Sequence, residues 1–248
     1  MTEEQRAWQT VLSRVESDLL DGTLVPGDRL PGERALAAEL GVGRSSVREA
    51  LRVLEVLGLI RTAAGSGPGA GAIIVATPRG GMSALLRLQV AAQGFALRDI
   101  VATRLVLETS VAETLAHQHP DLGDAEALLT AMNADGLTPD EFLALDARFH
   151  LSLAEASGNA VIAATMAGLR DAIESYVREG SERIEDWPPT AARLRAEHAG
   201  LLSAITDRDP DAARTRVHDH ITGYYAQITD PSHREESQNG HSPAPEAR

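Results

Sequence analysis

The sequence predicts a mainly α-helical protein, with a small N-terminal domain that contains one β-hairpin and an all-helical bundle after it. Apolar residues recur at three- and four-residue intervals through most of the 248 residues, which is the period of a helix with one buried face. Two short β-branched runs, 60–62 and 73–75, flank a glycine-rich segment and are expected to form the β-hairpin wing of a winged helix-turn-helix, and no comparable strand signal follows them. Prolines and glycines near 77–81 separate the two patterns.

These patterns divide the chain into a succession of parts. We expect an N-terminal domain over 1–76, a linker over 77–81, a helical domain over 82–228 and a disordered tail over 229–248. The length allows two ordinary domains, each with its own core. The tail prediction rests on the lack of large apolar residues from Pro231 onward.

The stretch from Leu30 to Ile60 predicts two short helices joined by a tight turn, after a first amphipathic helix over about 4–21. Gly41 stands where a left-handed residue ends a helix, and the next helix opens near Arg44. Apolar positions from Val47 onward give this second helix one buried stripe. The arrangement is that of a helix-turn-helix, whose second helix enters the major groove of DNA.

Arginines lie four residues apart on another face of that second helix, at Arg44, Arg48 and Arg52. An arginine there can bind guanine with both arms of its guanidinium, and the helix N-terminus favours phosphate. The alternative is that these arginines only pair with surface carboxylates such as Glu49 and Glu55.

The motif GxxxPGDRLPxER over 22–34, followed by LAxxxGVxRxxVREALRxLExxGLI over 36–60, closely resembles the winged-helix domain of the GntR transcription-factor family. The resemblance implies double-stranded DNA as a partner. It implies that the DNA-binding residues are Arg34, Arg44, Ser45, Ser46 and Arg48. Gly32 and Gly43 depart from the family pattern, and Gly43 removes a hydroxyl that could bind phosphate.

Composition restricts the remaining classes. A net charge of −13 argues against indiscriminate nucleic-acid binding, although six arginines face only five acids within 28–62. The lack of cysteine excludes disulfides and thiolate metal sites. No apolar run approaches the roughly 20 residues of a membrane span. We therefore expect a soluble, cytoplasmic protein with no membrane partner.

Beyond the linker the periodicity is helical throughout. Helices are predicted near 82–92, 97–118, 122–134, 138–157, 159–179, 187–207 and 209–228. On the fourth of these, Asp146 and His150 are four residues apart and share a face. Apolar neighbours turn His198 and His220 inward on the last two helices. One carboxylate and three imidazoles suit zinc, nickel or another divalent ion. The alternative is that Asp146 and His150 form only a simple hydrogen bond or surface pair.

The sequence RxxxE at 104–108, DxxFH at 146–150, SGN at 157–159, EH at 197–198 and DH at 219–220 resembles the FCD effector-binding domain of FadR-type GntR regulators. The resemblance implies that Asp146, His150, His198 and His220 hold a metal. It implies that Arg104 helps to bind a small organic acid, with Asn159 in the cavity. Alternatively, Glu108 at i+4 pairs with Arg104 in a helix salt bridge.

We therefore expect a ligand-responsive transcriptional regulator, more often a repressor than an activator in this arrangement. It would be a homodimer on a pseudo-palindromic operator, would respond to a small carboxylate effector and would contain a divalent metal ion, zinc or nickel. The competing hypothesis is a metal-dependent, hydrolase-type enzyme that activates water at the Asp/His₃ site. A third is a purely structural metal, which would leave Arg104 without a role.

Overall fold

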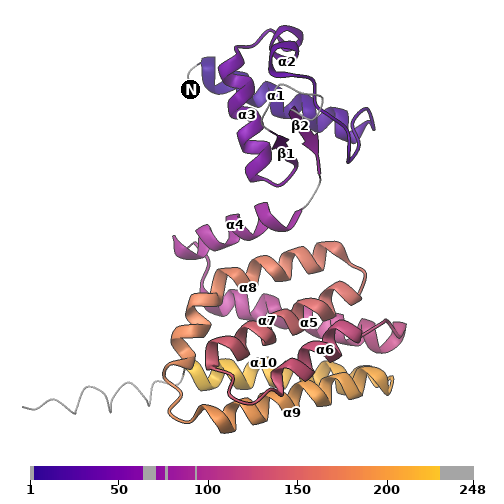
Figure 1. Cartoon of the computed structure of the whole chain (residues 1–248), viewed down its shortest axis with the longest axis vertical. Helices are drawn as coiled ribbons and strands as arrows, with labels where there is room; N and C mark the ends of the chain where they lie inside the picture. The colour runs from indigo at the N-terminus through magenta and orange to yellow at the C-terminus, as the bar shows by residue number, and fades with distance from the viewer. Residues whose placement is uncertain (1–2, 64–70, 76–77, 93, 230–248) are drawn as a thin grey trace, which may run out of the picture. The chain divides into compact units, whose positions relative to one another are not determined.

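The computed structural model describes residues 3–63, 71–75, 78–92 and 94–229 (Figure 1). They form two compact units that divide between Leu85 and Leu86. The predicted class, mainly α with one small hairpin, is confirmed. None of the described helices is both long and apolar enough to cross a lipid bilayer.

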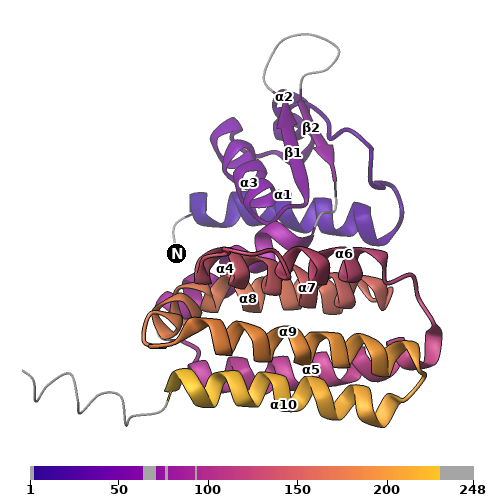
Figure 2. The ribbon, with the colours of Figure 1, turned by 60° about the horizontal axis from the view of Figure 1, so that its bottom comes forward.

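The N-terminal unit is a three-helix cluster with a two-stranded antiparallel sheet. Its elements are α1 (Glu3–Leu20), α2 (Glu33–Leu40), α3 (Arg44–Val56), β1 (Ile60–Ala63) and β2 (Gly71–Ile74). Figure 2 shows the β1/β2 hairpin beside α3. In the register of the two strands Ile60 lies opposite Ile74. One small core packs the three helices against the hairpin. Its buried residues include Val11, Val15, Leu36, Val47, Leu54, Ile60 and Ile74.

The turn between α2 and α3 follows from two glycines. Gly41 has a φ of 65°, in the left-handed region, and its N–H donates to the carbonyl of Ala37. Gly43 is extended and precedes the first turn of α3 without a side-chain cap. The helix-turn-helix predicted over 30–60 is therefore present, and the tip of the predicted wing, 64–70, lies outside the described residues.

Helix α4 (Pro78–Ala91) begins within the segment that the sequence predicted as a linker. Proline suits the first position of a helix because that N–H has no intrahelical acceptor, so Pro78 starts the helix rather than breaking it. Gly81 lies so close to the carbonyl of Leu57 that a Cβ there would collide with it. The helix expected from 82 therefore starts earlier.

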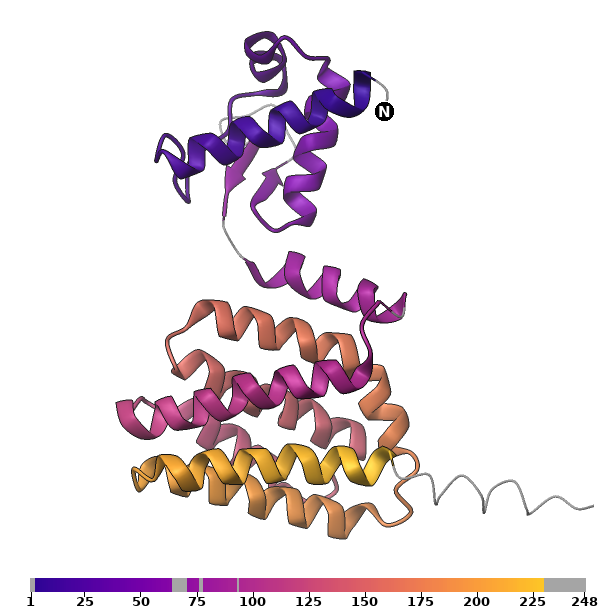
Figure 3. The ribbon, with the colours of Figure 1, turned by 180° about the vertical axis from the view of Figure 1, so that it is seen from behind.

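The C-terminal unit contains only helices among its described residues. They are α5 (Leu97–Gln118), α6 (Gly123–Met132), α7 (Pro139–Ala156), α8 (Ala160–Ser181), α9 (Trp187–Thr206) and α10 (Pro210–Thr229). Helix α10 packs along α5 and α9, and α7 packs against α6 and α8 (Figure 3). Their bounds agree with the predicted ranges to within about two residues, and the tail from 230 onward lies outside the described residues.

Helix α7 carries two of the candidate metal ligands, and a capping box fixes where it begins. The N–H of Glu141 donates to Thr138 Oγ1 at 3.3 Å, and the N–H of Thr138 donates to Glu141 Oε2 at 2.9 Å. Buried Phe142 and Phe149 then face the core, and Phe142 meets Trp187 edge-on at 5.6 Å between ring centroids.

We expect Thr138→Ala to lower the free energy of unfolding by about 1 kcal/mol, because it removes the acceptor for an N–H at the start of α7. Urea denaturation followed by circular dichroism measures the change. Thr138→Ser keeps the acceptor and should be close to the wild type. Equal losses in the two variants would show that the cap contributes nothing.

Candidate metal centre and DNA-binding surface

Four side chains from three helices of the C-terminal unit converge on one point. Asp146 and His150 come from α7, His198 from α9 and His220 from α10, and all their ligand atoms lie within 4.8 Å of one another. Asp146 Oδ1 is 3.1 Å from His198 Nε2, 3.8 Å from His150 Nε2 and 3.9 Å from His220 Nε2. Atoms bound tetrahedrally to zinc are about 3.4 Å apart, so the cluster has the size of a metal site.

Two carboxylates outside the cluster orient two of its imidazoles. His150 Nδ1 lies 2.6 Å from Glu108 Oε2, and His220 Nδ1 lies 2.8 Å from Glu197 Oε2. An ionised carboxylate only accepts hydrogen bonds, so each Nδ1 carries a proton and the Nε2 of each ring is directed toward the cluster. These two Nε2 atoms face each other at 3.1 Å. At that distance either a hydrogen bond between the two nitrogens or a cation that both of them bind can hold them together.

His198 gives a second reason for a cation. Both of its ring nitrogens are buried: Nδ1 has no hydrogen-bond partner within the described part of the chain, and Nε2 faces Asp146 Oδ1 at 3.1 Å. Burial lowers the pKa of His198 to about 4, so the ring is neutral near pH 7 and can donate a lone pair. A cation bound by both Nε2 and the Asp146 carboxylate would satisfy this buried pair. The donor set therefore fits a divalent ion of the first transition row.

Asp146 stays ionised in this interior. Burial alone would raise the pKa of its carboxyl, but the hydrogen bond with His198 and the charges around it hold the pKa well below its usual value. One of these charges is Arg170 on α8, whose Nη1 donates to the Asp146 carbonyl at 3.2 Å and whose Nη2 is 3.4 Å from Oδ2. The sequence analysis missed Arg170. Its signal is a lone arginine inside the apolar run of α8.

Arg104 on α5 forms the helix salt bridge that was one of its two predicted roles. Its Nη2 lies 2.7 Å from Glu108 Oε1, and its Nη1 donates to the Tyr225 hydroxyl at 2.8 Å. Burial disfavours the charge of Glu108, yet Arg104 and His150 keep the pKa of that carboxyl far below its usual range. Arg104 thus holds Glu108, and Glu108 in turn holds His150.

A small cavity of about 30 Å³ adjoins the cluster. Arg104, Arg170, Asp146 and His220 are among the residues that line it. Arg104 therefore faces a cavity as well as Glu108, so its salt bridge and a ligand role are compatible.

Asn159 lies elsewhere. It is an exposed N-cap of α8, where its side-chain oxygen accepts from the N–H groups of Val161 and Ile162 at 3.1 and 3.2 Å. It lines none of the cavities described here. Asn159 therefore caps α8 and does not line the cavity in which it was expected, because the SGN sequence ends one helix and begins the next.

In the N-terminal unit, Arg34, Arg44, Ser45 and Arg48 are exposed, and the last three lie on the first turns of α3. Arg48 is 3.9 Å from Glu33 Oε2 with more than half of its side chain exposed, so this pair leaves the guanidinium accessible. Ser46 differs from the expectation. It is only 6% exposed, because it shares the buried face of α3 with Val47.

A helix-turn-helix unit with exposed arginines, joined to a helical unit with a buried polar cavity, defines a ligand-responsive DNA-binding transcriptional regulator. Residues 8–68 match the family described as bacterial regulatory proteins, gntR family, and residues 99–223 match the FCD domain. The chain belongs to the GntR family of regulators with a C-terminal FCD domain, and its resemblance to this family is confirmed.

Individual relatives agree with this assignment. The chain is 32% identical, over 88% of its length and 84% of the relative, to the Escherichia coli (strain K12) protein named for regulation of the L-lactate dehydrogenase operon. It is 30% identical, over 89% of both chains, to the Glc operon transcriptional activator of the same strain. The solved structure of Streptococcus agalactiae GntR is similar with a TM-score of 0.56 and 26% identity, over 88% of this chain and 98% of that one. The hydrolase alternative has no support among these relatives.

The contact between Arg104 and Glu108 generates a prediction about stability. Arg104→Met should lower the free energy of unfolding by about 3–5 kcal/mol, because it leaves the buried Glu108 carboxylate without its strongest counter-charge. Adding Glu108→Gln to that variant should recover part of the loss, since the amide oxygen still accepts from His150. Denaturant titration of the wild type, the single variant and the double variant measures these differences in the free energy of unfolding. A double variant no more stable than the single one would contradict the assignment.

Proposed function

We propose that this chain is a metal-containing sensor of a small organic acid and represses transcription as a cytoplasmic homodimer on a pseudo-palindromic operator. Residues 1–76 would form the DNA-binding part, and 82–228 the metal- and effector-binding part. The observation that carries the proposal is the convergence of Asp146, His150, His198 and His220 beside a cavity with two arginines.

The donor set indicates which ion the cluster would hold. Three imidazoles and one carboxylate suit zinc or nickel, and a thiolate is absent because the chain has no cysteine. Asp146, His150, His198 and His220 would hold the ion, and the bound ion would supply Lewis acidity toward a carboxylate or hydroxyl of the effector.

The arginines would supply the organic-acid specificity. A guanidinium binds a carboxylate with two parallel hydrogen bonds, and in a buried site such a charge-assisted pair is stronger than in water. Arg104 is held by Glu108 and Tyr225, so it is pre-oriented rather than free to rotate. A hydroxy acid, keto acid or sugar acid has the chemistry to bind both the arginine and the metal. The name of one relative refers to L-lactate dehydrogenase, so L-lactate is a suitable first probe.

The DNA-binding part would use Arg34, Arg44, Ser45 and Arg48, whose exposure leaves them free for bases and phosphates. Ser46 would act from the buried side of α3 rather than as a direct contact. Two copies would read two half-sites, which multiplies the specificity of a small domain. The HTH-type transcriptional repressor NanR of Klebsiella aerogenes is 30% identical to this chain. Its name supports repression rather than activation as the effect on transcription.

Regulation would follow from a shift between two packings of the helical unit. An effector that binds one packing more tightly moves the population toward it, by no more than the difference in its two affinities. Helices α5, α7, α8 and α10 all contribute lining residues to the small cavity, so a ligand there would respond to their relative positions.

Metal content tests the cofactor. Purified protein should contain about one divalent ion per chain by elemental analysis, and His198→Ala combined with His220→Ala should lose it. His117→Ala combined with His218→Ala removes two exposed histidines and serves as the matched control. Metal-free wild-type protein that still binds L-lactate would overturn a metal role in sensing.

Footprinting on the promoter region of the chain's own gene tests the DNA-binding surface. Arg44→Ala and Arg48→Ala should each weaken protection about 5- to 150-fold with an unchanged circular dichroism spectrum, because bidentate base contacts contribute about 1–3 kcal/mol. Arg52→Ala, farther from the N-terminus of the same helix, should have a smaller effect. Unchanged protection in the first two variants would contradict the assignment, and a deletion strain with lower transcription would contradict repression.

A further inference from the structure

The small cavity beside the metal ligands adjoins a larger groove between α7 and α8. The two share Arg104, Leu143, Arg170 and Val177 in their linings. The inner one measures about 30 Å³, room for only a water molecule or two. The groove measures about 380 Å³, within the usual range for a small-molecule site. A ligand that reaches the cluster therefore has most of its available space in the groove.

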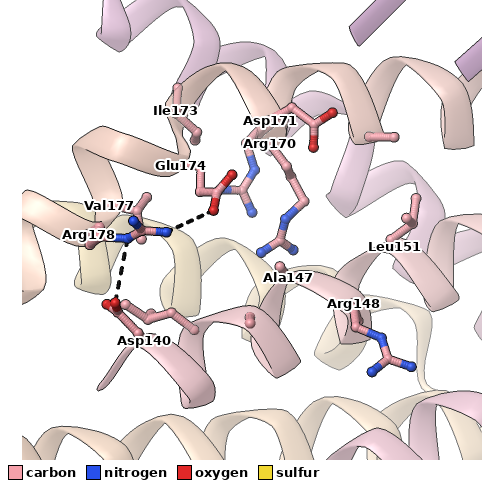
Figure 4. Close-up of a pocket in the computed structure, with 14 residues that line it drawn as sticks. Asp140, Ala147, Arg148, Leu151, Arg170, Asp171, Ile173, Glu174, Val177 and Arg178 are labelled. Carbon is pink, nitrogen blue, oxygen red and sulfur yellow. Dashed lines mark hydrogen bonds and ion pairs between the residues drawn. The ribbon is translucent and has the colours of Figure 1, made fainter. Parts of the chain in front are cut away.

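Arg170 lies where the two spaces meet. Figure 4 shows its guanidinium in the middle of the groove, between α8 and α7. Its contacts with Asp146, at 3.2 and 3.4 Å, are long for charge-assisted hydrogen bonds, whereas Arg104 makes contacts of 2.7–2.8 Å. Arg170 is thus a cation that lines the cavity and whose N–H groups are not all engaged in short hydrogen bonds.

The groove beyond Arg170 is mostly apolar. Its apolar lining consists of Leu143, Ala144, Ala147, Leu151, Ala167, Ile173 and Val177. Charged side chains are found at its edge, where Arg178 lies 3.0 Å from Glu174 and 3.7 Å from Asp140 (Figure 4). One arginine and two carboxylates leave that end slightly negative, so an anionic group is favoured at Arg170 and an apolar group along the wall.

We propose that the effector is a carboxylate with an apolar tail, whose carboxylate pairs with Arg170 and whose tail lies in the groove between α7 and α8. The inference rests on the proposed organic-acid sensor and narrows its ligand class. Arg170 is a binding residue in this scheme, beside Arg104. The short hydroxy acids would reach Arg170 but would fill little of the groove.

The size of the tail effect follows from burial. Each methylene removed from water contributes about a four-fold gain in affinity until the groove is filled. Loss of a charge-assisted pair at Arg170 should cost about ten- to hundred-fold for every carboxylate, irrespective of its tail. The two contributions are therefore separable.

Calorimetry with the full-length, metal-loaded chain tests this with L-lactate, 2-hydroxybutyrate, 2-hydroxyhexanoate and 2-hydroxyoctanoate. We expect affinity to rise about four-fold per methylene along the series. Ala147→Phe should abolish that gain while leaving L-lactate affinity within about two-fold, because the ring fills the groove and not the inner cavity. Ala127→Phe, at an exposed alanine of another surface groove, is the matched control and should leave the gain intact.

Arg170→Gln should weaken the whole series by one factor, with an unchanged gain per methylene and an unchanged metal content. If L-lactate binds as tightly as 2-hydroxyoctanoate, the tail assignment is wrong although the organic-acid sensor survives. If Arg170→Gln leaves every affinity unchanged, the anion assignment is wrong. If no acid binds to the metal-loaded chain, the proposed effector class itself fails, and this inference fails with it.

Discussion

A set of buried charges determines what the interior of the helical unit can bind. Glu108 and Asp146 are anionic, Arg104 and Arg170 are cationic, and all four are largely removed from water. Each ion costs several kcal/mol to bury, and the pairs recover that cost only through close contact. In this balance a divalent ion at the cluster would leave an excess of two positive charges. An anion in the adjoining cavity would compensate them, so metal binding would itself favour a negatively charged effector.

The same charges link helices that are distant in the sequence. Arg104 on α5 contacts Tyr225 on α10, and Glu108 on α5 orients His150 on α7. Glu197 on α9 orients His220 on α10. A bound ligand would therefore change the energy of several helix contacts at once. Packed helices move between discrete arrangements rather than deforming continuously, which is the kind of element that a small ligand can switch.

The sequence predicted the parts of this site that depend on local periodicity. Asp146 and His150 fall on one face because they are four residues apart, and apolar neighbours placed His198 and His220 inside. Helix bounds followed from the same periodicity together with prolines and glycines. The start of α4 was predicted four residues too late, because Pro78 was assigned to a linker although it begins the helix.

Contacts between distant segments could not be predicted in this way. The hydrogen bond from Arg104 to Tyr225 joins residues 121 positions apart, and that of Arg170 to Asp146 joins residues 24 apart. No pattern within one helix indicates which charge will face it from another. A local motif can also suggest a contact that the packing does not favour, as at Ser46. The motif suggested a phosphate contact, whereas the packing of α3 buries the side chain next to Val47.

The charge of the DNA-binding unit explains why the helical unit matters for DNA binding. Within 28–62 six arginines face five acids, so nonspecific attraction to the phosphate backbone is weak. A few placed arginines on one α3 would then give modest affinity. If two copies bind together, the second contact becomes intramolecular, and its strength depends on the spacing of the two units. Operator occupancy would thus depend steeply on the geometry of the paired helical units, which is the quantity that an effector in their interior can change.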